Sequence, residues 1–191
     1  MELKEIVSDV ANALVNIDRS GLAFRGFQKG VGPHGEPQLV KLIATALNHL
    51  NKYRDRVRTK RTPDLLIPSE WAIEFKITRP FGDNGKEAEN WSVNLLHPYP
   101  GNLSTIGDCM KLLNHSGTER RAIIVIGYEH VPAQIDLTPL LESFEAIAAN
   151  VLGIDLAPRI ETRHERLVHP VHQAVRVIGW EVLGRASHSQ N

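Results

Sequence analysis

Residues 71–78 alternate strictly between two kinds of side chain, and this pattern constrains the fold more than any other stretch. An alternation with a period of two is typical of a β-strand, in which successive side chains point to opposite faces. One face of the expected strand is apolar, and it consists of Trp71, Ile73, Phe75 and Ile77. The opposite face carries Glu74 and Lys76 next to each other, so a buried apolar face would fix the positions of both charged groups.

A shorter apolar run, residues 65–67, comes just before this strand and predicts a neighbouring one. The residues between the two runs, Pro68-Ser69-Glu70, have the length and composition of a hairpin turn. Antiparallel pairing would bring Asp64 across from the face that carries Glu74 and Lys76. Two carboxylates and an ammonium group would then converge.

Such a group of side chains has a chemical use. Two nearby carboxylates repel each other unless a cation lies between them, and hard oxygen ligands suit Mg²⁺ or Mn²⁺. The metal can polarise a phosphodiester oxygen and lower the pKa of a bound water, while Lys76 orients that water. Alternatively, Glu74 and Lys76 form an ion pair on the exposed side of a half-buried hairpin.

At these residues the chain resembles the PD-(D/E)xK nuclease superfamily, to which many restriction endonucleases and junction resolvases belong. Pro63-Asp64 matches the first motif element, and Glu74-Phe75-Lys76 matches the second. The resemblance implies an α/β fold of the restriction-endonuclease type, with a mixed central β-sheet flanked by helices. It also implies a Mg²⁺ site, open to Mn²⁺ as a substitute, formed by Asp64, Glu74 and the backbone carbonyl of Phe75, with Lys76 as the catalytic lysine.

Glu36 stands at the start of a second expected helix. Pro37 suits the first turn of a helix, and apolar residues then recur with helical spacing up to Leu50. An acidic residue in this place often serves only as a favourable partner of the helix dipole. In the family that the chain resembles, however, a glutamate of the first core helix often completes the metal site, and Glu36 has that place by its order in the chain.

A basic segment leads directly into Asp64. Its candidates for contact with DNA phosphates are Arg54, Arg56, Arg58, Lys60 and Arg61. A run of like charges usually forms a solvated face, but this run adjoins the candidate site, which favours phosphate contact equally. The formal net charge of zero argues mildly against a general binder of polyanions.

The remaining segments predict a sandwich of helices around a mixed sheet. We expect helices over residues 2–18 and 137–152, a short helix around Ile106 to Leu113, an interior strand over 122–127 and a last strand within 171–183. The chain of 191 residues has the length of one domain. We therefore expect a single nuclease domain over 1–191. The resemblance covers about residues 36–130, with helix 2–18 and segment 137–183 as additions.

Two loops remain open to more than one interpretation. The glycine-rich stretch 20–35 is either a flexible connection or a loop that contacts DNA. The stretch 80–102 carries Trp91, His97 and Tyr99, which serve either to stack on bases or to pin the loop to the core.

Other classes of site have little support. Cys109 is the only cysteine, which excludes disulfides and cysteine-based zinc sites and fits a reducing cytoplasm. The chain shows no signal-peptide pattern and no apolar run of membrane-spanning length, so we expect no membrane contact. His164, His169 and His172 lie close together, but we expect surface or DNA-backbone histidines in preference to a zinc site.

The sequence thus predicts a Mg²⁺-dependent DNA endonuclease with a role in restriction or a related defence. A small chain that cuts both strands of a duplex most simply acts as a homodimer. The alternatives are a DNA repair nuclease or junction resolvase, a nucleic-acid-binding module without catalysis, and an unrelated α/β protein in which the motif is coincidental. The recognition sequence, the choice between DNA and RNA, and any companion methyltransferase are not encoded in a readable pattern.

Overall fold

A seven-stranded mixed sheet forms the centre of the molecule in the computed structural model, which describes residues 1–99 and 104–185. The strands run in the order β1-β2-β3-β4-β7-β5, and β6 also pairs with β7. Their bounds are β1 Arg58–Thr59, β2 Leu65–Ile67, β3 Trp71–Thr78, β4 Arg120–Glu129, β5 Ile154–Leu156, β6 Ile160–Glu165 and β7 Ala174–Arg185.

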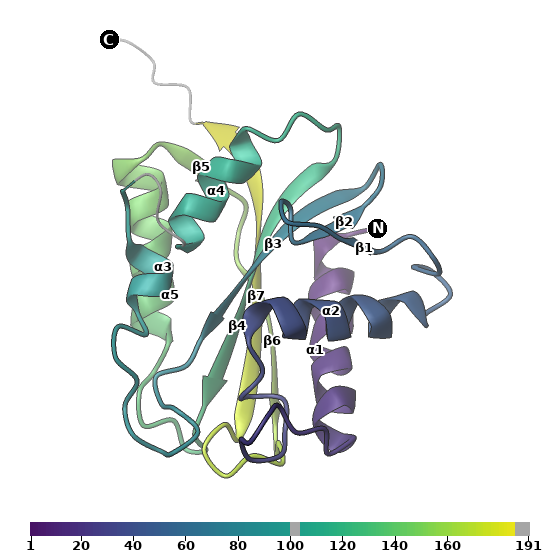
Figure 1. Ribbon diagram of the computed structural model, residues 1–191. Helices are drawn as coiled ribbons and strands as arrows, with labels where there is room; N and C mark the ends of the chain where they lie inside the picture. Colours follow the sequence, from purple (N-terminus) through teal and green to yellow (C-terminus); the bar gives the residue numbers. More distant parts are fainter. Residues whose placement is uncertain (100–103, 186–191) are drawn as a thin grey trace.

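Helices cover both faces of this sheet, as Figure 1 shows. One layer consists of α1 (Leu3–Arg19) and α2 (Glu36–Asn48), and the other of α3 (Val93–Leu96), α4 (Thr105–Leu113) and α5 (Thr138–Ala146). Each layer packs its apolar side on one face of the sheet, which gives two separate hydrophobic cores. The predicted α/β class, with a mixed sheet flanked by helices, is confirmed. None of the described helices is long and apolar enough to cross a membrane.

The predicted hairpin is present. β2 and β3 pair antiparallel, with Leu65 opposite Ile73 and Ile67 opposite Trp71. The apolar face of β3 packs against α1 and α2, as its alternation indicates. The other face is covered as well, because α4 packs on it, and all eight residues of β3 are buried. Glu74 and Lys76 are therefore not the exposed ion pair of a half-buried hairpin, since they are only 3% and 7% exposed.

The chain after β3 crosses the sheet face through α3 and α4 and returns as β4, which pairs parallel with β3. β4 is the interior strand that the apolar run 122–127 predicts, with β3 on one side and β7 on the other. This crossover places α4 directly over the polar face of β3. The candidate residues of β3 thus face a helix that the motif does not include.

Several elements differ from the prediction. The expected helix 137–152 is α5 followed by a π-helical turn over Ile147–Val151, labelled η1. Strands β1, β5 and β6 were not predicted. β6 is amphipathic only weakly, because every second residue is half-buried and none is fully buried. Its place is set by pairing with β7 and by the cover of α1.

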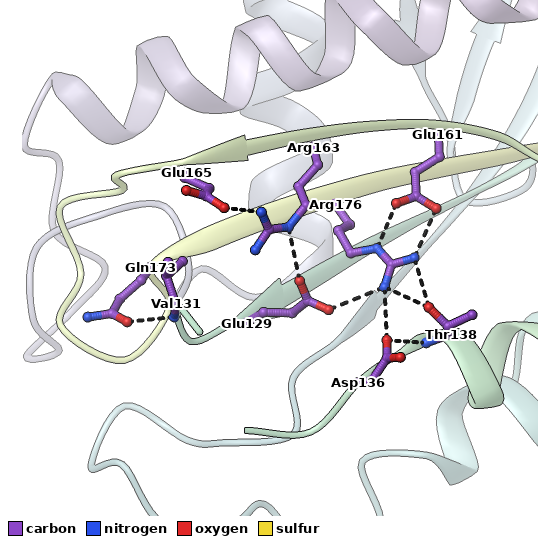
Figure 2. Close-up of polar contacts among 9 residues, drawn as sticks. All are labelled: Glu129, Val131, Asp136, Thr138, Glu161, Arg163, Glu165, Gln173 and Arg176. Carbon is purple, nitrogen blue, oxygen red and sulfur yellow. Dashed lines mark hydrogen bonds and ion pairs between the residues drawn. The ribbon is translucent and has the colours of Figure 1, made fainter. Parts of the chain in front are cut away.

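A partly buried ion-pair network ties β4, β6 and β7 to the start of α5 (Figure 2). Arg176 is at its centre. The guanidinium donates two hydrogen bonds to the Glu161 carboxylate, at 2.8 and 2.9 Å, and lies 3.3 Å from Glu129 Oε1. Thr138 and Asp136 accept further bonds of 3.4 to 3.5 Å. The network is distant in sequence from the β2–β3 hairpin and holds the opposite half of the sheet together.

Candidate active site

The candidate site lies just before the start of β2, where the edge of β3 is left uncovered. β2 begins at Leu65, so the preceding residue, Asp64, continues the register to a position opposite Glu74. The Asp64 carboxylate replaces the backbone acceptor that a longer β2 would provide, because its Oδ2 accepts the Phe75 backbone N–H at 2.8 Å. The N–H and C=O of one strand residue point to the same edge. The Phe75 carbonyl is therefore directed to the side on which Asp64 lies.

Glu74 points into the space between this edge and α4. Its Oε1 is buried and has no hydrogen-bond partner among the described residues. Burial, and then the neighbouring Asp64 carboxylate, raise the pKa of Glu74 to about 9. An unsatisfied buried carboxyl is costly to the folded state, and it is the kind of group that a cation would satisfy.

This raised pKa predicts a pH dependence of stability. The ordinary pKa is 4.5, so between that value and about 9 the folded state keeps a proton that the unfolded state has lost. The stability that Glu74 contributes is present below pH 4.5 and is lost as pH rises, by about 1.4 kcal/mol per pH unit within the window. We expect Glu74→Gln to leave the free energy of unfolding unchanged at pH 4 and to raise it at pH 8. Urea denaturation without divalent metal measures both, and equal stabilities at pH 8 would contradict the assignment.

Lys76 is held between two further carboxylates. Its Nζ lies 2.9 Å from Asp108 Oδ2 and 3.4 Å from Glu36 Oε1. The second Glu36 oxygen accepts the Ile77 backbone N–H at 3.2 Å, which is the next N–H on the same open edge of β3. Glu36 therefore lies beside Lys76, as its order in the chain predicts. Its role as a metal ligand remains a prediction.

The charge state of Lys76 follows from these contacts. Burial by itself would lower the pKa of Lys76, but the carboxylates of Asp108 and Glu36 outweigh burial and raise the pKa above its ordinary value. The ammonium group is therefore protonated at neutral pH. It can donate hydrogen bonds and balance negative charge, but it is not a general base.

Asp108 is the functional candidate that sequence reasoning missed. It lies on α4, is 2% exposed, and binds Lys76 with one oxygen and Lys111 Nζ with the other at 2.6 Å. A signal was present. Thr105 and Leu112, which are three and four residues away, belong to the buried face of this helix, and Asp108 shares that face. A carboxylate on the apolar side of a helix needs a buried cation, and Lys76 is that cation.

The approach to Glu36 is fixed by the loop before α2. Asp18, at the end of α1, is buried and accepts the backbone N–H groups of Val31 and Val168, at 2.9 and 2.7 Å. Gln28 is bound to Asp83 at two points. The glycine-rich stretch 20–35 is thus hydrogen-bonded to the end of α1 through Asp18 and to the loop after β3 through Asp83. These contacts fix the position at which α2 begins.

The basic segment is exposed, but only part of it lies at the site. All five predicted phosphate contacts are exposed: Arg54, Arg56, Arg58, Lys60 and Arg61. Arg56 is paired with Glu70, and Arg54 donates to Asn51 at 2.7 Å. Lys60 lines a groove of about 280 Å³ together with Lys41 of α2, Thr59 and Asp64. Lys41 was not predicted, and it gives this groove a second cation, contributed by α2.

Two of the three clustered histidines do not behave as predicted. His169 and His172 are 1% and 2% exposed and stack on each other with ring centroids 4.4 Å apart, so the expectation of surface histidines is wrong for both. His169 binds Asp83, and His172 binds the Phe81 carbonyl. Burial lowers the pKa of His172 to about 4, so it is neutral at physiological pH. Across residues 1–99 and 104–185, no group of three or more His, Cys, Asp or Glu side chains is arranged to hold a metal ion.

The residues named by the motif therefore do converge. Asp64, Glu74 and Lys76 meet at one edge of β3, and Glu36 and Asp108 join them from α2 and α4. Comparison with known protein families, with curated proteins and with solved structures finds no match for this chain.

Proposed function

We propose that this protein is a Mg²⁺-dependent nuclease that hydrolyses phosphodiester bonds in DNA. The observation that carries the proposal is the Glu74 carboxyl opposite Asp64, whose buried Oε1 has no hydrogen-bond partner among the described residues, beside a protonated lysine at an open strand edge. Two facing carboxylates without a cation are unfavourable, and the pKa of Glu74 is raised first by burial and then by the Asp64 carboxylate. A divalent cation would relieve it.

The donor set fits Mg²⁺, with Mn²⁺ as a substitute. The ligands would be Asp64, Glu74 and the backbone carbonyl of Phe75, all of which are hard oxygen donors. Three protein ligands are few, but Mg²⁺ usually keeps several waters and takes further ligands from substrate phosphates. Glu36 would add a ligand through one of those waters. When bound, the metal would polarise the scissile phosphate and lower the pKa of a coordinated water.

The side chains of this chain then have separate roles. Lys76 would donate hydrogen bonds to the attacking water and offset the negative charge that develops on the phosphate. Asp108 and Glu36 hold the lysine in place from opposite sides and keep it protonated. Asp64 and Glu74 would neutralise the cation. No step requires a covalent bond between enzyme and substrate.

The order of elements supports the same interpretation. Helix α2 is followed by the antiparallel strands β1, β2 and β3, then by the crossover helix α4 and the parallel strand β4. This order agrees with the restriction-endonuclease-like core implied by the motif. We therefore propose that fold, with restriction or a related defence function as the first role and repair or junction resolution as the second. Cleavage of both strands of a duplex would require a homodimer.

The test is cleavage of supercoiled plasmid, linear phage DNA, branched DNA and single-stranded RNA with Mg²⁺, with Mn²⁺ and with EDTA. Wild type is compared with Asp64→Ala and with Arg185→Ala, an exposed basic residue at the end of β7. We expect metal-dependent cleavage of DNA that is lost in Asp64→Ala and retained in Arg185→Ala. Discrete fragments would support restriction, whereas preference for branched DNA would support repair.

Two outcomes would contradict the proposal. Equal cleavage by wild type and Asp64→Ala would indicate a contaminating nuclease. Binding of DNA without cleavage under every metal condition would favour a non-catalytic nucleic-acid-binding module on the same fold.

The groove beside Asp64 gives a prediction about DNA affinity. Lys41 of α2 and Lys60, which follows β1, both line it, so both are placed to contact phosphates of a substrate whose cleaved bond lies at Asp64. Replacing both by alanine should weaken DNA binding for all sequences. The negative slope of the logarithm of the association constant against the logarithm of the salt concentration should become less steep by about 0.9 per contact, or nearly 2 together. Fluorescence anisotropy between 50 and 200 mM salt (roughly the range in which such slopes are measured) gives the slope. Arg185→Ala is the matched control, and an unchanged slope in the double variant would exclude the groove.

A further inference from the structure

A second hollow lies next to the candidate site, at the far end of β3. Its volume is about 310 Å³, at the lower end of the range of about 300–1,000 Å³ for small-ligand pockets. The lining includes Ile77 and Arg79 from β3 and the residue after it, Phe81 and Glu89 from the following loop, and Trp91 and Asn94 beside and within α3. Ile77 belongs to both sites, because its N–H binds Glu36.

The walls of this hollow are fixed before any ligand binds. The loop folds back as a small hairpin, with Phe81 bridged to Glu87 and with Ala88 N–H donating to the Pro80 carbonyl at 2.8 Å. His172 Nε2 lies 2.9 Å from the Phe81 carbonyl, and Asp83 binds His169. The buried histidine pair thus anchors the loop from below. A preformed pocket costs little ordering entropy on binding.

Arg79 is the feature that indicates what the hollow binds. It makes no salt bridge with any described residue, and its side chain donates a hydrogen bond to the His34 carbonyl at 2.7 Å. Its guanidinium lies 6.0 Å from the centroid of the Tyr128 ring, and burial lowers the pKa of Arg79. A guanidinium carries five N–H donors, and most of those of Arg79 have no hydrogen-bond partner among the described residues. A guanidinium with free N–H donors in a fixed planar arrangement is suited to bind a ligand with two adjacent acceptor atoms.

Trp91 supplies a flat apolar wall. It is half-buried, and it also lines a neighbouring hollow of about 400 Å³. Stacking of a nucleobase on an aromatic ring is a common way to hold single-stranded nucleic acid. Arg79 is three residues beyond Lys76, or about 10 Å along an extended strand. That is a distance of one or two nucleotides from the proposed site of cleavage.

We propose that this hollow binds one unstacked nucleobase of the substrate, and that guanine is preferred. The base would stack on Trp91, and Arg79 would donate to its O6 and N7 atoms, the commonest specific contact of arginine with a base. Glu89 would accept from the N–H groups on the opposite side of the ring, and adenine lacks this combination of groups. This inference rests on the proposed function, since it identifies a specificity pocket of the same nuclease.

The test is binding of short oligonucleotides in EDTA, which requires no catalysis. Labelled thymidine pentanucleotides carry guanine, adenine or an abasic site at the centre, and anisotropy gives each dissociation constant. We expect guanine to bind at least about fivefold more tightly than the abasic site, the lower end of what stacking of one base supplies. Guanine should also bind more tightly than adenine, and Arg79→Lys should reduce that second difference.

Intrinsic fluorescence provides an independent readout. Trp71 and Trp180 are 0% and 1% exposed, so quenching by a stacked base reports on Trp91. Guanine should quench wild type and leave Trp91→Phe unchanged. Equal affinities for guanine and the abasic site in wild type would overturn the inference, and so would quenching that persists in Trp91→Phe.

The two proposals fail in distinguishable ways. Metal-dependent cleavage without a base preference at this position would contradict the proposed base pocket and support the nuclease function. A guanine preference without cleavage would support the proposed base pocket and contradict the catalytic function.

Discussion

Replacing Lys76 by methionine should slow the proposed metal-dependent DNA cleavage by at least about 10²-fold, the usual effect of removing one preorganised donor to developing charge. The ammonium group is buried between Asp108 and Glu36, and no other described lysine contacts both carboxylates. Methionine has a similar length and no charge, so it would fill the same space. Single-turnover rates with saturating protein and Mg²⁺ measure the chemical step apart from binding.

Lys111→Met is the matched control for this prediction. Lys111 binds the other oxygen of the same Asp108 carboxylate, but its side chain is 39% exposed, and it does not contact Glu36 in the described contacts. We expect its effect on the rate to be only about tenfold, the lower end of the effect of a group that acts through another residue. The rate loss in Asp108→Asn should fall between the losses in the two lysine variants, because this change removes one ion pair of Lys76 but keeps the lysine itself. Similar losses in both lysine variants would contradict the assignment of Lys76.

Removing Arg176 should produce the largest loss of stability. Its side chain is 9% exposed and is paired with Glu129, which is 3% exposed. Arg176→Met would leave that buried carboxylate with Arg163 alone, and breaking a buried pair costs about 3–5 kcal/mol. Urea denaturation at pH 7 measures the change in the free energy of unfolding.

Two comparisons check the cause. Arg163→Met removes an arginine of the same network whose side chain is 36% exposed, and it should cost under about 1 kcal/mol. The double variant Arg176→Met with Glu129→Leu removes both buried charges and should recover part of the loss. A loss in the double variant as large as the sum of the single losses would show that the two residues act independently.

The β2–β3 hairpin and its residues were predictable because the relevant signals are local. The alternation of residues 71–78 defines which side chains share a face, and the short turn at residues 68–70 defines the partner strand. Asp64 therefore falls opposite Glu74 by register alone. α1 and β4 were predictable for the same reason, since each has a strong apolar pattern of its own.

The rest of the site depends on contacts between distant segments. Asp108 is 32 residues after Lys76 in the printed sequence, and only the crossover of α4 brings the two together. The burial of Glu74 has the same origin, because the face that would be exposed in a lone hairpin is covered by that helix. β6 lacks an apolar pattern, and its strand conformation follows from β7.

The account is tested most directly by the rate of DNA cleavage by wild type and by Glu74→Gln, purified side by side and started by adding Mg²⁺. Glutamine has the same shape and size as the protonated carboxyl and can form hydrogen bonds, but it carries no negative charge and cannot neutralise a cation. The account predicts cleavage by wild type and a rate lower by at least about 10³-fold in the variant, which loses several kcal/mol of metal-based stabilisation. Equal rates in the two proteins, or no cleavage by wild type, would contradict it.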